Sequence, residues 1–133
     1  MRFTIPVAPA ANRYWRTRVA TTRMGKRYVQ TYVSPEARRY KILVWNQLKA
    51  AKIPVLEGPV AVSIWWIRTA RRGDLDGRLK VALDALNGVA WQDDRQVVEL
   101  HAHVLDGSQN EMTVMVAPPA SSGSVGRRGR ELL

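Results

Sequence analysis

The sequence predicts a single α/β domain, in which two helices pack on a small mixed β-sheet. Segments with alternating apolar residues are interleaved with segments whose apolar residues recur every three or four positions. Their order is strand, arm, strand, helix, strand, helix, strand, strand. The chain has 133 residues, 46% of them hydrophobic, which is enough for one core. It has no cysteine, which excludes disulfides and thiolate metal sites and fits a reducing compartment.

The first third of the chain predicts two strands separated by a basic arm. Residues 2–7 alternate in polarity, with their apolar side chains on one face, and so predict the first strand. Residues 12–27 are rich in arginine and lysine and indicate an irregular arm. Residues 28–33 predict a strand that closes a hairpin or flap over this arm.

The first helix has a strong start signal at Ser34-Pro35-Glu36. Serine caps free amides, proline suits the first helical position, and glutamate complements the positive end of a helix. The helix is expected to run to about Lys52, because Ile53-Pro54 stops it. Its predicted core-facing residues are Ala37, Tyr40, Val44, Leu48 and Ala51.

Residues 60–68 predict a strand, in which Trp65 and Trp66 must point to opposite faces. A second helix follows residues 74–76 and is expected to end near residues 87–88, where Asn-Gly suits a cap. Its predicted core-facing residues are Leu75, Leu79, Ala82, Leu83 and Leu86.

The last strands are predicted at residues 96–105 and 111–117, as an antiparallel hairpin that turns at 106–108. Proline, alanine, serine, glycine and arginine then dominate without periodicity. We therefore expect a folded domain over residues 1–117 and a disordered basic tail over 118–133.

Charge favours a polyanionic partner. Lysine and arginine number 21 against 11 aspartates and glutamates, which gives a formal net charge of +10. Such an excess indicates nucleic acid or an acidic membrane, and we favour nucleic acid. No apolar run approaches the roughly 20 residues that span a bilayer, so we expect a soluble, cytoplasmic protein without a membrane partner.

Carboxylates are concentrated in one stretch of 21 residues, which holds Asp74, Asp76, Asp84, Asp93 and Asp94. Grouped carboxylates repel one another unless cations share the space. In an extended segment Asp74 and Asp76 would point the same way, and a third carboxylate from the later loop would complete an oxygen-rich Mg²⁺ site. Lys80 lies one helical turn beyond Asp76 and could stabilise charge on a reacting phosphate.

Each of these residues also has a purely structural interpretation. Asp76 could cap the second helix, and Asp93-Asp94 could form an ordinary polar turn. Lys80 and Asp84 could form a solvated ion pair, which is the interpretation we favour for Asp84.

Basic and aromatic residues before the carboxylates predict contacts with DNA. Arginines can clamp phosphates, and aromatic rings can stack on unpaired bases. The alternative for the arm is a core aromatic pair beneath a solvated basic loop. The predicted contact residues are Arg13, Tyr14, Trp15, Arg16, Arg68, Arg71 and Arg72.

Three runs in the second half of the chain resemble the RusA family of Holliday-junction resolvases. They are Arg-Arg-Gly-Asp-Leu-Asp-Gly-Arg-Leu-Lys at 71–80, Leu-Asp-Ala-Leu-Asn-Gly at 83–88 and Trp-Gln-Asp-Asp-Arg-Gln-Val at 91–97. A looser similarity covers Pro9, Asn-Arg-Tyr-Trp-Arg at 12–16 and the helix start, so the resemblance extends from Arg2 to about Ala117.

The resemblance implies a RusA-like fold and a junction endonuclease of DNA recombination and repair, in a bacterial or phage-infected cell. It implies that Asp74, Asp76 and Asp94 bind Mg²⁺, with Mn²⁺ as a possible substitute, and that Lys80 assists catalysis. It also implies a homodimer that cuts two opposed strands of a four-way DNA junction symmetrically. One departure is Gly77, where the family commonly has asparagine.

Two other functions remain open at this point. One is a non-catalytic protein of the same fold that binds branched or single-stranded DNA, for which Gly77 is the support in the sequence. The other is a metal nuclease that acts on RNA.

Overall fold

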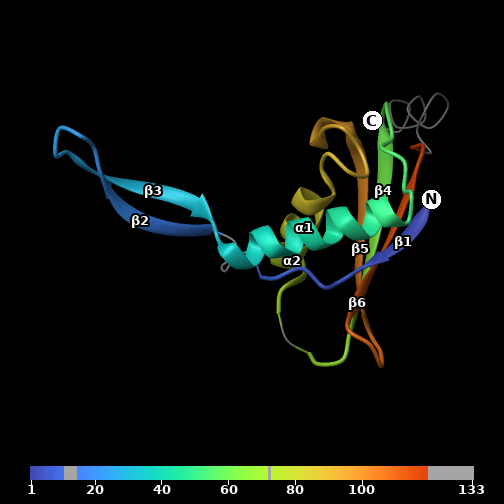
Figure 1. Cartoon of the computed structure of the whole chain (residues 1–133). Helices are drawn as coiled ribbons and strands as arrows, with labels where there is room; N and C mark the ends of the chain where they lie inside the picture. Colours follow the sequence, from blue (N-terminus) through green and yellow to red (C-terminus); the bar gives the residue numbers. More distant parts are fainter. Residues whose placement is uncertain (11–14, 72, 120–133) are drawn as a thin grey trace, which may run out of the picture.

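The computed structural model describes residues 1–10, 15–71 and 73–119. It contains a body, made of one sheet and two helices, and a hairpin that projects from it (Figure 1). Neither of the two α-helices described here is long and apolar enough to cross a membrane. The elements are β1 (Arg2–Ile5), β2 (Trp15–Thr21), β3 (Arg27–Val33), α1 (Pro35–Ala50), β4 (Val60–Arg68), α2 (Leu75–Leu86), the 3-10 helix η2 (Asp94–Gln96), β5 (Val97–Asp106) and β6 (Glu111–Ala117).

The sheet of the body is mixed, with strand order β1-β6-β4-β5. β5 runs parallel to β4, whereas β6 pairs antiparallel with both β4 and β1. The predicted hairpin between the last two strands is therefore wrong, because β4 lies between them. The physical reason is burial: β4 hides every second side chain, and a neighbour on each side completes its backbone hydrogen bonds.

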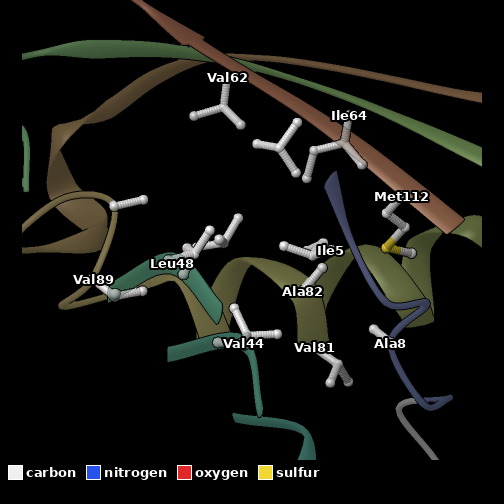
Figure 2. Close-up of a cluster of buried hydrophobic side chains, with 14 of the residues drawn as sticks. Ile5, Ala8, Val44, Leu48, Val62, Ile64, Val81, Ala82, Val89 and Met112 are labelled. Carbon is white, nitrogen blue, oxygen red and sulfur yellow. The ribbon is translucent and has the colours of Figure 1, made fainter. Parts of the chain in front are cut away.

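Both α-helices cover the same face of this sheet, and the core lies between the two layers (Figure 1). Figure 2 shows side chains of β4 facing those of α1 and α2 across the core. Trp66 is on this face and only 2% exposed, whereas Trp65 points to the other side of the sheet, as strand alternation predicts. The fold is therefore the predicted small α/β domain.

The helix α1 begins where its start signal predicts. The hydroxyl of Ser34, which is buried, accepts a hydrogen bond of 3.2 Å from the backbone N–H of Ala37. The helix ends at Ala50, earlier than expected, because Lys52 adopts a left-handed φ of 56° and Ile53 N–H bonds to Leu48 O. Ala51 is consequently exposed rather than part of the core.

The buried face of α2 is rotated from the one predicted. Val81, Ala82, Ala85 and Leu86 are buried, whereas the leucines at positions 75, 79 and 83 are only partly buried against the core. The helix lies against both α1 and the sheet, so two neighbouring stripes of its surface are covered. Its end is as expected, since Asn87 is the C-terminal cap and Gly88 has a φ of 88°.

The hairpin consists of β2 and β3, which form a separate two-stranded sheet from Trp15↔Val33 to Thr21↔Arg27. The predicted irregular arm is thus wrong over residues 15–21. The high charge concealed a strand pattern, in which β-branched residues at positions 17 and 19 face β-branched partners at 31 and 29. The first strand is shorter than predicted, because Pro6 cannot continue the ladder.

Candidate active site

The first turn of α2 carries Asp74 and Asp76, but not in the predicted extended arrangement. Asp74 occupies the N-cap position, and Asp76 already lies in the helix. The alternative in which Asp76 is the cap is therefore also wrong. Both carboxylates are exposed, and the Asp74 side chain makes no capping hydrogen bond, so its oxygens are available to a ligand.

The approach to Asp74 is shaped by Gly73, which has a φ of 90°. A Cβ at this glycine would lie 2.8 Å from Arg78 Nε and 3.3 Å from the Trp66 ring. The Arg78 guanidinium lies over that ring, 5.0 Å from its centroid, and donates a 2.6 Å hydrogen bond to Ala8 O. The left-handed φ and the close approach to Arg78 and Trp66 both favour glycine at this position.

One side of α2 carries Asp76, Lys80 and Asp84, which follow one another at four-residue spacing. Successive members are about 6 Å apart along the helix axis. Lys80 is exposed, and Asp84 forms an ion pair of 3.7 Å with Lys41 of α1, a pair that spacing within α2 did not predict.

The two aspartates after α2 have different partners. Asp93 caps η2: it accepts a 2.9 Å hydrogen bond from the backbone N–H of Arg95 and forms a capping box with Gln96. This backbone hydrogen bond, and the Arg95 side chain after it, lower the pKa of Asp93. Asp94 instead accepts a 3.1 Å hydrogen bond from Nε1 of Trp91, a fully buried residue. Asp94 is thus oriented from the core, whereas Asp93 has a local structural role.

Asp84 belongs to the same acidic region as Asp94. Partial burial, followed by the charge of Asp94, raises the pKa of Asp84. The sequence places Asp84 in the acidic stretch, but the interpretation favoured for it was a solvated ion pair with Lys80. Its position eight residues after Asp76, on one side of a helix, was the available signal that it shares the acidic face.

The carboxylates do not form a ready three-ligand site in one chain. Across residues 1–10, 15–71 and 73–119, no group of three or more histidine, cysteine, aspartate or glutamate side chains could hold a metal ion. Within the described residues of one chain, Asp74, Asp76 and Asp94 therefore do not converge into the expected three-ligand group. The donor chemistry nevertheless fits Mg²⁺, which takes one or two carboxylates and keeps several waters.

The arginines before α2 are partly held by the protein itself. Nε of Arg68 donates a 3.2 Å hydrogen bond to Asp106, and the Arg68 guanidinium lies 5.8 Å from the centre of the Trp66 ring. Arg71 is exposed and 3.7 Å from the same aspartate. Asp106 thus holds two of the predicted DNA-contact residues beside the segment that leads to Asp74.

The remaining predicted DNA contacts lie on or near the hairpin. Arg16 is exposed on β2. The backbone of Trp15 starts this strand, but its side chain lies outside the described part of the chain. Arg13, Tyr14 and Arg72 also lie outside the described residues, as does most of the predicted tail.

Comparison with protein families gives a match that spans most of the chain. The family model described as Endodeoxyribonuclease RusA matches residues 5–117. This range includes the hairpin, the acidic face of α2, Asp94 and the body apart from the first residues of β1. A comparison with curated proteins gave no match. The matched range, together with the fold and the acidic region at α2, establishes that the chain belongs to the RusA family of endodeoxyribonucleases.

Proposed function

We propose that the protein is a Mg²⁺-dependent endonuclease that resolves four-way DNA junctions during recombination or repair. The observation that carries this proposal is the family match over residues 5–117, in a chain with exposed carboxylates at the start of α2. The net charge of +10 supports a polyanionic substrate. A bacterial cell or one infected by phage is the setting that this function implies.

The proposed metal ligands are Asp74, Asp76 and Asp94. Asp74 is suited to this role because its side chain makes no capping hydrogen bond, and Asp94 because Trp91 orients it. When bound, Mg²⁺ or its substitute Mn²⁺ would supply Lewis-acid polarisation of the phosphate and a lower pKa for attacking water. Because the described residues of one chain do not gather three such side chains, the proposal is that these exposed carboxylates come together when the metal and DNA bind.

Lys80 has a separate role in this proposal. Water attacks the phosphorus, and the bond to the leaving ester oxygen breaks, so negative charge builds on the non-bridging oxygens. The exposed ammonium of Lys80, one turn beyond Asp76, is placed to stabilise that charge. Arg68 and Arg71 would bind neighbouring phosphates from the segment before Asp74.

A homodimer completes the proposed mechanism. A two-fold axis presents the same surface of both copies to a substrate that itself has opposed equivalent strands. Each copy would then cut one strand, which gives two symmetric nicks. Sedimentation of the full chain should give the mass of a dimer, and a monomer bound to an intact junction would contradict this part.

The test of the proposal is cleavage of a synthetic four-way DNA junction by the full chain with Mg²⁺. We expect paired, symmetric nicks that chelation abolishes and that Asp74→Asn abolishes while junction binding remains. Linear duplex and an RNA junction of matched sequence are the control substrates. Equal cleavage of the duplex would contradict selectivity for junctions, and faster cleavage of the RNA junction would support an RNA nuclease. No cleavage of any substrate with Mg²⁺ or Mn²⁺ would contradict the proposal that the protein is an enzyme.

A second candidate is a non-catalytic protein that binds branched or single-stranded DNA. Two observations favour it: Gly77 stands where the family commonly has asparagine, and the described carboxylates do not form a three-member group in one chain. This candidate predicts that wild type and Asp74→Asn bind a junction equally, with and without metal, and that neither cuts it. Metal-dependent cleavage by the wild type would exclude it.

A further inference from the structure

The hairpin of β2 and β3 has two faces of different chemistry, because strand side chains alternate. One face, here called the cationic face, carries Arg16 opposite Tyr32, Arg18 opposite Gln30 and Ala20 opposite Tyr28. The other face carries mainly threonine and valine, including Val19 and Val29, which are 68% and 71% exposed, and it has one cation, Arg27, at the end next to the turn.

The charge of this hairpin is of one sign, with two cations on the cationic face and three at or beside the turn. Between Trp15 and Val33 the sequence contains five basic residues and no acidic one. These five are half of the net charge of +10, in a segment that projects from the body (Figure 1). They are Arg16, Arg18, Arg23, Lys26 and Arg27.

Arg18 is held in place although it is exposed. Its guanidinium carbon lies 4.9 Å from the centre of the Tyr32 ring, and its Nε donates a 2.9 Å hydrogen bond to Oε1 of Gln30. These contacts use the ring face and one N–H, and no hydrogen bond among the described residues uses the two terminal amino groups. A guanidinium oriented in this way can donate two parallel hydrogen bonds to a phosphate and loses little side-chain freedom on binding.

We infer that the cationic face of the hairpin lies along an arm of the DNA substrate, with Arg18 as its fixed phosphate-binding residue. A two-stranded ribbon fits the major groove of a duplex, and each strand of seven residues is about 24 Å long. Tyr28 and Tyr32 add aromatic surface beside the cations. This inference rests on the proposed function, and it narrows the DNA contact expected of residues 12–27 to one face of the hairpin and one fixed side chain.

The test measures binding of a four-way junction by the full chain at several salt concentrations, with chelator so that nothing is cut. Arg18→Gln should weaken binding roughly tenfold, and should lower the slope of log affinity against log salt by about 0.9, the loss of one phosphate contact. Arg2→Gln is the matched control, because Arg2 is exposed on β1, at the opposite end of the molecule from the hairpin (Figure 1). It should leave both quantities unchanged.

A second pair of variants tests the orientation of Arg18. Tyr32→Leu should weaken binding because it removes the ring beneath the guanidinium, whereas Tyr32→Phe should bind as wild type because it keeps the ring. Equal effects of Arg18→Gln and Arg2→Gln, or wild-type binding by Tyr32→Leu, would overturn the inference. A wild type that binds through Arg18 but never cuts would refute the proposed enzyme and leave the hairpin contact standing. Normal cutting by the wild type, together with unchanged junction binding by the hairpin variants, would refute the hairpin contact and leave the proposed enzyme standing.

Discussion

At the scale of single residues, the site depends on side chains that the substrate need not touch. Trp91 is buried and still orients Asp94, and the stacked Arg78 and Trp66 determine how closely the loop before Asp74 can pass. The position of the carboxylates is therefore linked to the packing of the core beneath them.

Gly73→Ala tests this link. The new Cβ would meet Arg78 Nε at 2.8 Å, in a backbone conformation that L-residues rarely adopt. Gly58→Ala is the matched control, because Gly58 also has a positive φ but nothing lies within 4 Å of its Cβ. We expect Gly73→Ala to lower the free energy of unfolding by roughly 1 kcal/mol more than the control does, and to slow junction cleavage. If urea denaturation gave the same loss of unfolding free energy for Gly73→Ala and Gly58→Ala, the contact with Arg78 would be one that a small shift of its side chain relieves.

At the scale of elements, the two α-helices begin differently. The Ser34 hydroxyl caps α1 from a buried position, whereas the Asp74 side chain makes no capping bond to α2. A cap that stabilises its helix cannot easily serve another purpose, whereas Asp74 is free to bind a ligand.

Substitution of the two caps should show this difference. Ser34→Ala should lower the free energy of unfolding by about 1 kcal/mol, and Asp74→Asn should change it by no more than about 0.5 kcal/mol. Thermal or urea unfolding of both variants in metal-free buffer measures the two values. A large loss for Asp74→Asn would mean that this residue supports the fold, and its effect on cleavage could then not be assigned to metal binding.

Local signals in the sequence predicted the elements better than their pairing. The strand 60–68 and the strand 111–117 have the predicted bounds, and α1 starts at its Ser-Pro-Glu signal. Alternation indicates that one face of a strand is buried, but it carries no information about which strand is the neighbour. The position of β4 between β5 and β6 was therefore not predictable from these patterns.

The candidate site was predictable only in part, for a similar reason. The sequence Asp-Leu-Asp is compatible with a cap at either aspartate, and only packing of the helix against the sheet decides for Asp74. The spacing of Asp93 and Gln96 fits a capping box and was a usable signal that Asp93 is structural. No local pattern could indicate that Lys41 reaches Asp84 from another helix. Trp91 and Asp94 are only three residues apart, but this spacing alone does not indicate a hydrogen bond between them.

At the scale of the whole molecule, the hairpin contributes very little to the core of the body. Val33 is the one residue of the hairpin among the described residues that pack in or against the core. Two-stranded hairpins have little stability by themselves, so this one depends on the body while the body does not depend on it. The hairpin is thus expected to serve binding rather than stability.

Replacement of residues 16–32 by a short Gly-Ser linker between Trp15 and Val33 tests this division. We expect the free energy of unfolding to stay within about 1 kcal/mol of wild type, since the removed residues bury almost no core surface. For the same reason, the slope of this free energy against urea concentration should stay close to that of wild type. Junction affinity should fall further than in Arg18→Gln, with a flatter salt dependence, because five cations are removed together. Circular dichroism and urea denaturation establish that the shortened chain is folded before binding is measured. If the body unfolded without the hairpin, the hairpin would be part of the folding unit, and the loss of DNA binding in this variant would then reflect lost structure rather than lost contacts.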